Sequence, residues 1–376
     1  KSGIEFHQEF ADLEFRSHVC GTIRADIKEL IPRKHLRFMG DGSAYSYISM
    51  AESIEDAGLA EEDLASEKTG LIIGSGVASG APLVEMADVL RNKGARKVNP
   101  FYVPKIMSSC NAANLATAFK IRGYSYTISS ACATSGHCLG NAYQLIQAGE
   151  QDLMFIGGGD EVSWVVSIPF DAMGALSSNF NSNPESASRA YDRDRDGFVV
   201  SGGGGTIVLE EYERAKARGA KIYCEVTGYG ISSDGDDMVR PSGEGAERCM
   251  KMALKTVDGP IDYLNAHGTS TPAGDITELT AINNVFSGNG QLPHISSTKS
   301  LTGHALGAAG VHESIYCILM MENDFICPSV NIENLDPEAD SYPIVLEPMN
   351  NHSLNSVISN SFGFGGTNCS LVFSKV

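Results

Sequence analysis

A repeated segment constrains the fold of this chain more than any other feature of its sequence. Residues 128–142 read ISSACATSGHCLGNA, and residues 295–309 read ISSTKSLTGHALGAA. The two segments align without a gap at an offset of 167 residues, and eight of the fifteen positions are identical. Each follows a strand-like run and precedes a helical pattern, which predicts two related halves. The charged segment 210–221 joins them, so we expect halves at 1–215 and 216–376.

Short apolar runs that lead into glycines predict an α/β fold. The runs 71–73, 153–156 and 357–358 have the composition of strands, and a cluster of glycines follows each one. Strands of this kind, alternating with helices, form sheets with crevices at the strand ends. A dinucleotide site is not expected, because no glycine triplet opens a helix with an acidic residue about 20 positions further on.

Apolar residues at helical spacing predict the helices of both halves. In the segment 43–58, Gly58 is a plausible helix stop. Other helices are expected at 107–123, from Cys132 to about residue 147, at 243–257, 275–286 and 311–323, with a short charged one at 210–219.

The two halves differ at their starts. The second opens with a strand-like run, 222–229, whereas the residues before Ser43 are polar and loop-like. A sheet built like that of the second half needs an equivalent strand. We therefore expect the first strand of the first half to be missing from this chain.

Composition excludes several classes of protein. The 376 residues include 28 Lys and Arg and 46 Asp and Glu, so the formal charge of −18 argues against a nucleic-acid partner. No apolar run approaches the ~20 residues that span a bilayer, so no membrane partner is expected. Nine cysteines without a CxxC pair argue against a disulfide framework and structural zinc, and favour a reducing cytoplasm.

Cys132 is a candidate nucleophile. It lies in YTISSACATS, residues 126–135, which predicts a strand, a sharp turn of small residues and a helix. The positive end of the helix dipole and free N–H groups are expected to lower the pKa of such a thiol and to receive an oxyanion. From this local context alone, a buried structural cysteine is equally compatible. Five further cysteines are expected to be packing thiols: Cys110, Cys138, Cys317, Cys327 and Cys369.

Two histidines lie in loops that favour catalysis. His267 is in NAHGTSTP, residues 265–272, and His304 ends TKSLTGH, residues 298–304. Both loops contain glycine and follow apparent strand ends, where α/β active sites form. His137 is the repeat partner of His304, but we expect it to lie in the helix after Cys132 with a structural role.

Four motifs together resemble the β-ketoacyl-acyl-carrier-protein synthases, the condensing enzymes of fatty acid synthesis. They occur in the family's order: SSACATS at 129–135, HGTSTP at 267–272, KSLTGHALGAAG at 299–310 and NSFGFGGTN at 360–368. The likeness covers essentially the whole chain. Ser201 with the glycines at 202–205 resembles the type I elongating synthases, and a type II synthase or a polyketide ketosynthase is the alternative.

The resemblance implies the thiolase-like fold, a five-layered αβαβα sandwich of two pseudo-symmetric halves that is dimeric in the family. The first half would carry the nucleophilic Cys, and the second the two His and the Lys. The implied reaction is the decarboxylative Claisen condensation of malonyl carrier protein with an acyl-Cys enzyme. Acyl carrier protein is the implied partner, and no cofactor is required.

Roles for the reacting groups follow from the same resemblance. Cys132 takes the acyl chain, and His267 and His304 donate hydrogen bonds to the malonyl thioester oxygen. These histidines would therefore serve decarboxylation more than acylation. The backbone N–H groups of Cys132 and Phe364 would hold the oxyanion, and Phe364 would also gate the site.

The resemblance assigns five supporting residues as well. Lys299 is implied as the active-site lysine and Glu278 as its partner carboxylate, in a pair that is either catalytic or purely architectural. Thr269 and Thr271 would bond the phosphopantetheine arm. Phe170 would be a wall of the acyl pocket, or an ordinary core aromatic.

Three further sets of residues complete the implied site. Arg33, Lys34 and Arg37 match the family's carrier-docking residues, and a second basic cluster contains Lys93, Arg96, Lys97 and Lys105. No metal is required, but four residues match positions that can hold a monovalent cation or form a hydrogen-bonded cluster without one: Asn265, Glu313, Ser359 and Asn360.

Other functions fit the motifs less well. A non-catalytic partner subunit would lack the nucleophile, and Cys132 is present. Initiating synthases carry a Cys-His-Asn set and thiolases a second catalytic cysteine, whereas this chain has two loop histidines. A cysteine hydrolase would leave the second histidine and Lys299 without a use.

Overall fold

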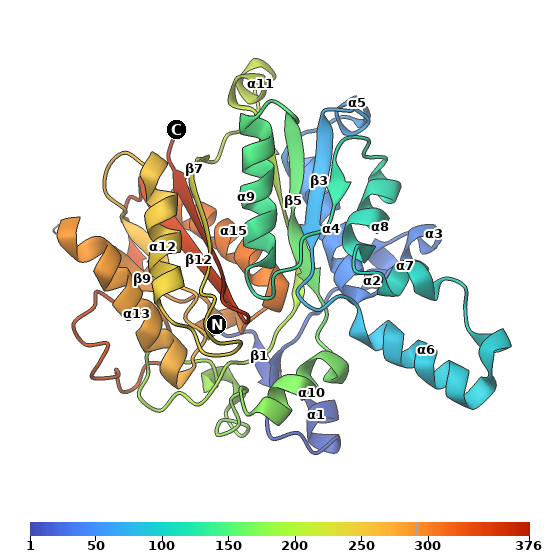
Figure 1. Ribbon diagram of the computed structural model, residues 1–376, viewed down its shortest axis with the longest axis horizontal. Coiled ribbons are helices and arrows are strands. Elements are labelled where there is room, and N and C mark those ends of the chain that lie inside the picture. The colour runs from blue at the N-terminus through green and yellow to red at the C-terminus, as the bar shows by residue number, and fades with distance from the viewer. Residues whose placement is uncertain (290–291) are drawn as a thin grey trace.

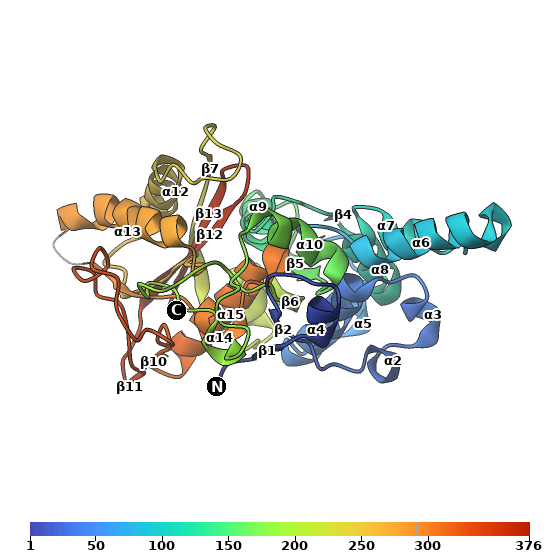
Figure 2. The same ribbon diagram turned by 90° about the horizontal axis from the view of Figure 1, so that it is seen from below.

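Two sheets enclose two central helices, and further helices cover the outer face of each sheet (Figure 1, Figure 2). The computed structural model describes residues 1–289 and 292–376. The first sheet contains β4 (Ser125–Tyr126), β3 (Thr69–Gly74), β5 (Leu153–Asp160) and β6 (Gly203–Glu210), in that order. The second contains β7 (Glu225–Ser233), β13 (Thr367–Ser374), β12 (Ser356–Gly363), β8 (Tyr263–Asn265) and β9 (His294–Ser296).

The helices complete the five expected layers. The central layer holds α9 (Thr134–Gln147) and α15 (Ala309–Glu322). Outside the first sheet lie α4 (Asp41–Asp56) and α8 (Cys110–Phe119), and outside the second lie α12 (Glu244–Ala253) and α13 (Pro272–Phe286). The αβαβα sandwich predicted from the sequence is thus confirmed. In the described ranges, no helix combines the length and the apolar character needed to cross a membrane.

The two sheets share one strand order, with one difference. In each, two central strands run parallel, an edge strand adds parallel on one side, and an antiparallel strand adds on the other. The second sheet has β7 beyond its antiparallel strand, and the described part of the first half has no counterpart to it. The residues before α4, expected to be a loop, instead include β1 (Ile4–Phe6) paired with β2 (Val19–Gly21).

The sequence repeat occupies equivalent places but forms different local structures. The first copy runs from β4 through a sharp turn directly into α9, so His137 is helical. It bonds Ser130 Oγ at 2.6 Å and the Asn368 carbonyl at 3.1 Å. The second copy forms a short helix, α14 (Lys299–Thr302), which ends at Gly303 with φ +71°. Glycine adopts that conformation without strain, and the chain after it leaves His304 in a loop.

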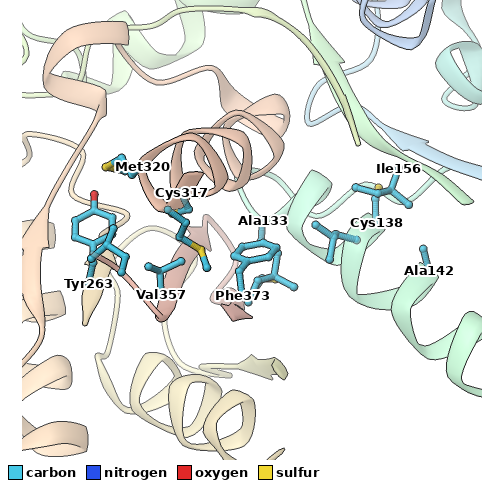
Figure 3. Close-up of a cluster of buried hydrophobic side chains, with 14 of the residues drawn as sticks. Ala133, Cys138, Ala142, Ile156, Tyr263, Cys317, Met320, Val357 and Phe373 are labelled. Atoms are coloured by element: carbon cyan, nitrogen blue, oxygen red, sulfur yellow. The ribbon is translucent and has the colours of Figure 1, made fainter. Parts of the chain in front are cut away.

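The central helices pack against both sheets through small and apolar side chains (Figure 3). Cys138 and Ala142 of α9 and Cys317 and Met320 of α15 belong to one buried cluster with Phe373 of β13. Four of the five predicted packing thiols are fully buried, and the fifth, Cys327, is partly buried.

The glycine run at 202–205 allows β6 to lie between two helices. A Cβ at Gly204 would lie 2.4 Å from the carbonyl carbon of Tyr45 in α4. A Cβ at Gly205 would lie 2.8 Å from a methyl group of Val311 in α15, on the other face. Successive strand residues face opposite sides, so each glycine admits one helix.

Every helix predicted from periodicity overlaps an observed one, including the short charged α11 (Tyr212–Ala217). Gly58 has φ +60° just after the C-cap of α4, as expected for a helix stop. Among the described residues, two helices of ten residues or more escaped prediction, α6 (Gly80–Lys93) and α10 (Trp164–Met173), as did several short ones. The stripe of α6, Leu83, Met86 and Leu90, was overlooked, and it faces outward, since Leu83 and Leu90 are each 49% exposed. The helix α10 is interrupted by Pro169.

Candidate active site

Loops from both halves bring the three reactive side chains together. Cys132 follows Ala131, whose φ of +49° marks the sharp turn before α9, and His267 follows β8 by two residues. His304 Nε2 lies 3.0 Å from Cys132 Sγ, and the two imidazole ring centroids are 5.3 Å apart. The ligand-type atoms of all three residues lie within 4.8 Å of one another.

Burial has the largest effect on the pKa of the nucleophile. Burial raises the pKa of Cys132 to about 12, although Lys299 and the N–H groups of Phe364 and Cys132 act to lower it. The lowered pKa expected from the sequence is therefore wrong. Both N–H groups nevertheless face the sulfur, as an oxyanion hole at this position requires.

Both histidines are neutral in this environment. Burial lowers the pKa of His267 and of His304 well below 6.5, and the charge of Lys299 lowers both further. A neutral imidazole has one N–H and one lone pair, so each ring can either donate or accept. Neither Nδ1 atom has a hydrogen-bond partner among the described residues, so no contact found there fixes the tautomer.

The partner of Lys299 differs from the expected one. Its ammonium group is buried and pairs with Glu313 on α15, not with Glu278. Glu278 on α13 instead accepts hydrogen bonds from the backbone N–H groups of His267 and Gly268, at 2.9 and 2.8 Å. Glu278 therefore holds the loop that carries His267. Burial raises the pKa of Glu313 to about 7 and raises that of Glu278 as well.

A cavity of about 370 Å³ opens onto Cys132 and both histidines. Phe170 and Phe198 line it, with ring centroids 5.4 Å apart, and the Phe170 ring lies 6.3 Å from that of Phe364. Thr269 and Thr271 also line it, and their hydroxyl oxygens are 3.1 Å apart. The cavity is thus apolar on the phenylalanine side and offers hydroxyl groups on the other.

Three of the four residues expected to bind a monovalent cation have a free oxygen in the part of the chain that the structure describes. Asn265 Oδ1, Glu313 Oε2 and Ser359 Oγ are buried and have no hydrogen-bond partner within the described ranges. All three residues neighbour Cys317. Asn360 is engaged elsewhere, since its Oδ1 accepts from Ser370 Oγ at 2.7 Å and its Nδ2 donates to Glu278 at 3.2 Å. The three unpaired oxygens are of the kind that a small hard cation binds. Asn360, the fourth expected ligand, is not available, because both of its side-chain polar atoms are already hydrogen-bonded.

The expected docking residues lie outside the cavity. Arg33, Lys34 and Arg37 are exposed on and just after α3 (Arg33–Leu36). The Arg37 guanidinium stacks over the rings of Phe38 and Phe101, with its carbon 4.7 and 5.1 Å from their centroids. That contact brings the segment before α7 (Tyr102–Ile106), which carries Lys105, against α3.

Sequence reasoning missed two parts of the site. One is Asp160, a buried carboxylate at the end of β5, for which the preceding three glycines at a strand end were a usable signal. The other is the loop around Met238, whose carbonyl accepts a hydrogen bond from Gly365 N at 2.8 Å. This loop lines the cavity beside Phe364, and no local pattern in the sequence indicates that contact.

Comparisons with known proteins find relatives along the whole chain. The family model "Beta-ketoacyl synthase, N-terminal domain" matches residues 17–215, and "Beta-ketoacyl synthase, C-terminal domain" matches residues 223–333. The 3-oxoacyl-[acyl-carrier-protein] synthase 1 of Haemophilus influenzae is 57% identical over 376 residues, covering 100% of this chain and 92% of the relative. The Escherichia coli K12 protein of the same name is 56% identical over 378 residues, with the same coverage.

Solved structures agree with these relatives. A β-ketoacyl synthase from Burkholderia phymatum has a TM-score of 0.91 and 34% identity, covering 100% of this chain and 93% of that one. A ketosynthase of a type II polyketide synthase, solved in complex with its acyl-carrier protein, has a TM-score of 0.91 and 29% identity at the same coverage.

We expect a double-mutant cycle to identify Glu313 as the partner of Lys299. Lys299→Met and Glu313→Leu each leave one buried charge unpaired, and each should lower the free energy of unfolding by ~3–5 kcal/mol. The double variant removes both charges, so its loss should be well below the sum. With Glu278→Gln in place of Glu313→Leu, the coupling should be below ~1 kcal/mol. Denaturant unfolding measures both cycles, and a larger coupling to Glu278 would contradict the pairing.

Proposed function

The chain belongs to the β-ketoacyl synthase family, and we propose that Cys132, His267 and His304 carry out its condensation reaction. It is an acyl-transferring condensing enzyme of fatty acid elongation, a 3-oxoacyl-[acyl-carrier-protein] synthase. The observation that carries the assignment of residues is the 3.0 Å contact between His304 Nε2 and Cys132 Sγ, at a sulfur that two backbone N–H groups also face.

Acylation needs a thiolate, which the resting site does not hold. Because burial raises the pKa of Cys132 to about 12, the thiol must lose its proton as the sulfur attacks the acyl thioester. The lone pair of the neutral His304 takes that proton. The N–H groups of Cys132 and Phe364 hold the oxyanion of the tetrahedral intermediate. When the carbonyl re-forms, the carrier's thiolate leaves and takes the proton from His304.

Condensation follows when malonyl carrier protein enters. His267 and His304 donate N–H groups to its thioester oxygen and stabilise the enolate that forms as CO2 leaves. The enolate carbon attacks the acyl carbonyl on Cys132, and the bond between that carbonyl and the sulfur breaks. Cys132 leaves as the thiolate and regains a proton from solvent. His304 can accept in one step and donate in the next because no contact among the described residues fixes its tautomer.

We propose that the cavity binds both the acyl chain and the phosphopantetheine arm of the substrate. Phe170 forms a wall for the acyl chain, and the hydroxyl groups of Thr269 and Thr271 bond the phosphopantetheine arm. Phe364, which lies between Gly363 and Gly365, is 37% exposed. It gates the passage from the part of the cavity that holds the phosphopantetheine arm to the part that holds the acyl chain. Lys299, paired with Glu313, supplies the buried positive charge, and Glu278 positions His267. A monovalent cation held by Asn265, Glu313 and Ser359 would add positive charge behind this pair.

Membership of the family and several exposed features support a proposal for the partner and the assembly. We propose acyl carrier protein as the partner, docked at Arg33, Lys34 and Arg37, a homodimer, and a cytoplasmic location. Dimerisation is supported by β4, an edge strand at which Tyr124 and Tyr126 are 42% and 39% exposed. The names of the similar synthases favour type I over the type II alternative. We keep the boundary between the halves near residue 215, in α11.

The function is tested by a condensation assay with acyl and malonyl carrier proteins. We expect Cys132→Ala to abolish acyl transfer, because no other thiol of the described residues lies beside His304. Intact mass of the wild type after incubation with acyl carrier protein should show one acyl adduct, located on Cys132. An adduct on Cys110 or Cys138 would overturn the assignment.

We expect the two histidines to divide the work unequally. His267→Ala should lower malonyl decarboxylation by ~10²–10³ and leave acylation of Cys132 close to the wild-type rate, because it loses one donor to the enolate. His304→Ala should slow both half-reactions, since the same ring also receives the thiol proton. The sequence-based expectation is that both histidines serve decarboxylation more than acylation. We now expect this of His267 alone. Single-turnover acylation and CO2 release measure the two steps, and an equal loss in both for His267→Ala would refute the division.

Docking provides a further prediction. Because the protein carries −18 and its proposed partner is acidic, a local positive surface must attract the carrier. Arg33→Glu combined with Lys34→Glu should lower the association rate with acyl carrier protein, and added salt should weaken wild-type docking. Acylation by a small acyl-pantetheine thioester serves as the control and should be nearly unchanged. Wild-type kinetics of the variant with carrier-bound substrate would show that these residues are only a solvated face.

A further inference from the structure

A buried carboxylate lies where loops from both halves of the site meet. Asp160 ends β5 and has no exposed surface. It accepts hydrogen bonds from Gly76 N at 3.0 Å, from Gly307 N at 2.8 Å and from the Ser75 hydroxyl. Ser75 and Gly76 follow β3 in the first half, whereas Gly307 lies three residues after His304 in the second. Asp160 therefore ties the loop that follows His304 to the first sheet.

The loops around this carboxylate touch backbone to backbone. A Cβ on Gly307 would lie 2.4 Å from Gly76 N, and a Cβ on Gly76 would lie 3.2 Å from the Ala131 carbonyl oxygen. Ala131 precedes Cys132 and has φ +49°, and Leu306 precedes Gly307 and has φ +51°. Left-handed backbone at residues other than glycine persists where surrounding contacts hold it. The Cys132 turn and the His304 loop are thus linked through Asp160 and Gly76.

The charge of Asp160 also reaches the nucleophile. Its hydrogen-bond donors are neutral: the three named above and Val77 N at 3.4 Å. Around Cys132, the charged and titratable groups are Lys299, Asp160 and the two neutral histidines. Lys299 lowers the pKa of the thiol, and Asp160 raises it.

We propose that Asp160 is a positioning residue, whose carboxylate holds the His304 loop against the Cys132 turn and so sets the contact between the two side chains. The inference rests on the roles proposed above for Cys132 and His304. It adds a group that touches neither substrate nor sulfur.

Asp160→Asn is the direct test, because it keeps the shape and removes the charge. The amide oxygen can keep the N–H groups of Gly76 and Gly307, but as a neutral acceptor it binds them more weakly than a carboxylate. The NH2 group would face the Ser75 hydroxyl, which can accept, and the N–H of Val77, whose contact is lost. We expect kcat for condensation to fall by ~10²-fold, as for a misplaced catalytic pair, with KM for the carrier unchanged. Removing the negative charge should lower the pKa of Cys132, so alkylation of Cys132 by iodoacetamide at a fixed, mildly alkaline pH should speed up ~3-fold. A general loosening of the fold would speed alkylation of other buried cysteines, such as Cys110 and Cys138, as well, whereas removal of the charge should speed alkylation at Cys132 only.

Ser75→Ala and Asp262→Asn complete the design. Ser75→Ala removes one donor to Asp160 without changing charge, so it should fold and lower kcat ~3–10-fold with unchanged alkylation. It decides the question if Asp160→Asn does not fold. Asp262→Asn is the matched control, because Asp262 also accepts from two backbone N–H groups, those of Asn355 and of Ser356 at the start of β12. It lies just before β8, whereas His267 follows the other end of that strand. This variant should keep wild-type kcat and alkylation.

The outcomes separate this inference from the proposed function. If Cys132→Ala still condenses substrate, the proposed function fails. If Cys132→Ala is inactive while Asp160→Asn keeps wild-type kcat and alkylation, the positioning role alone is wrong. If Asp160→Asn does not fold, wild-type kcat in Ser75→Ala overturns the role in the same way.

Discussion

Burial of α9 and α15 between the two sheets is the constraint on which the site depends. Both helices pack on two sides, so each sheet must bring an inner face to within contact distance of them (Figure 3). Gly140 shows how close the approach is, because a Cβ there would lie 2.1 Å from the Tyr229 ring of β7. Loops from both halves therefore meet where the central helices begin. The nucleophile comes from one half and both histidines from the other, so neither half alone holds the site.

The same burial determines the charges at the reacting centre. Desolvation raises the pKa of the Cys132 thiol and lowers those of His267 and His304, so the resting site holds a neutral thiol and two neutral imidazoles. Lys299 and Glu313 form an ion pair behind them. A thiolate formed only in contact with the acyl thioester meets its electrophile at once. Neutral imidazoles also keep the N–H groups that an enolate oxygen needs.

The sequence was sufficient for what local patterns encode. The strand–turn–helix pattern around Cys132 and the glycine-containing loops of His267 and His304 predicted candidates that the fold does bring together. The partner of Lys299 could not be predicted this way, because the rotation of α13 and α15 about their axes decides which carboxylate reaches the ammonium group. The pKa of Cys132 was predicted with the wrong sign because the helix terminus is visible in the sequence and the depth of burial is not.

The internal repeat shows how one segment came to serve two purposes. Cys132 aligns with Lys299, and His137 aligns with His304. Equivalent positions of the repeat therefore hold a nucleophile in one half and a buried charge in the other, and likewise a structural histidine and a reactive one. Gly136 is helical, whereas its partner Gly303 ends a short helix with φ +71°. Together with the left-handed backbone of Leu306, whose repeat partner Leu139 is helical, this difference takes His304 out of a helix and into the loop beside Cys132. A site whose halves had remained identical would offer two of one group, and this reaction needs groups of different kinds.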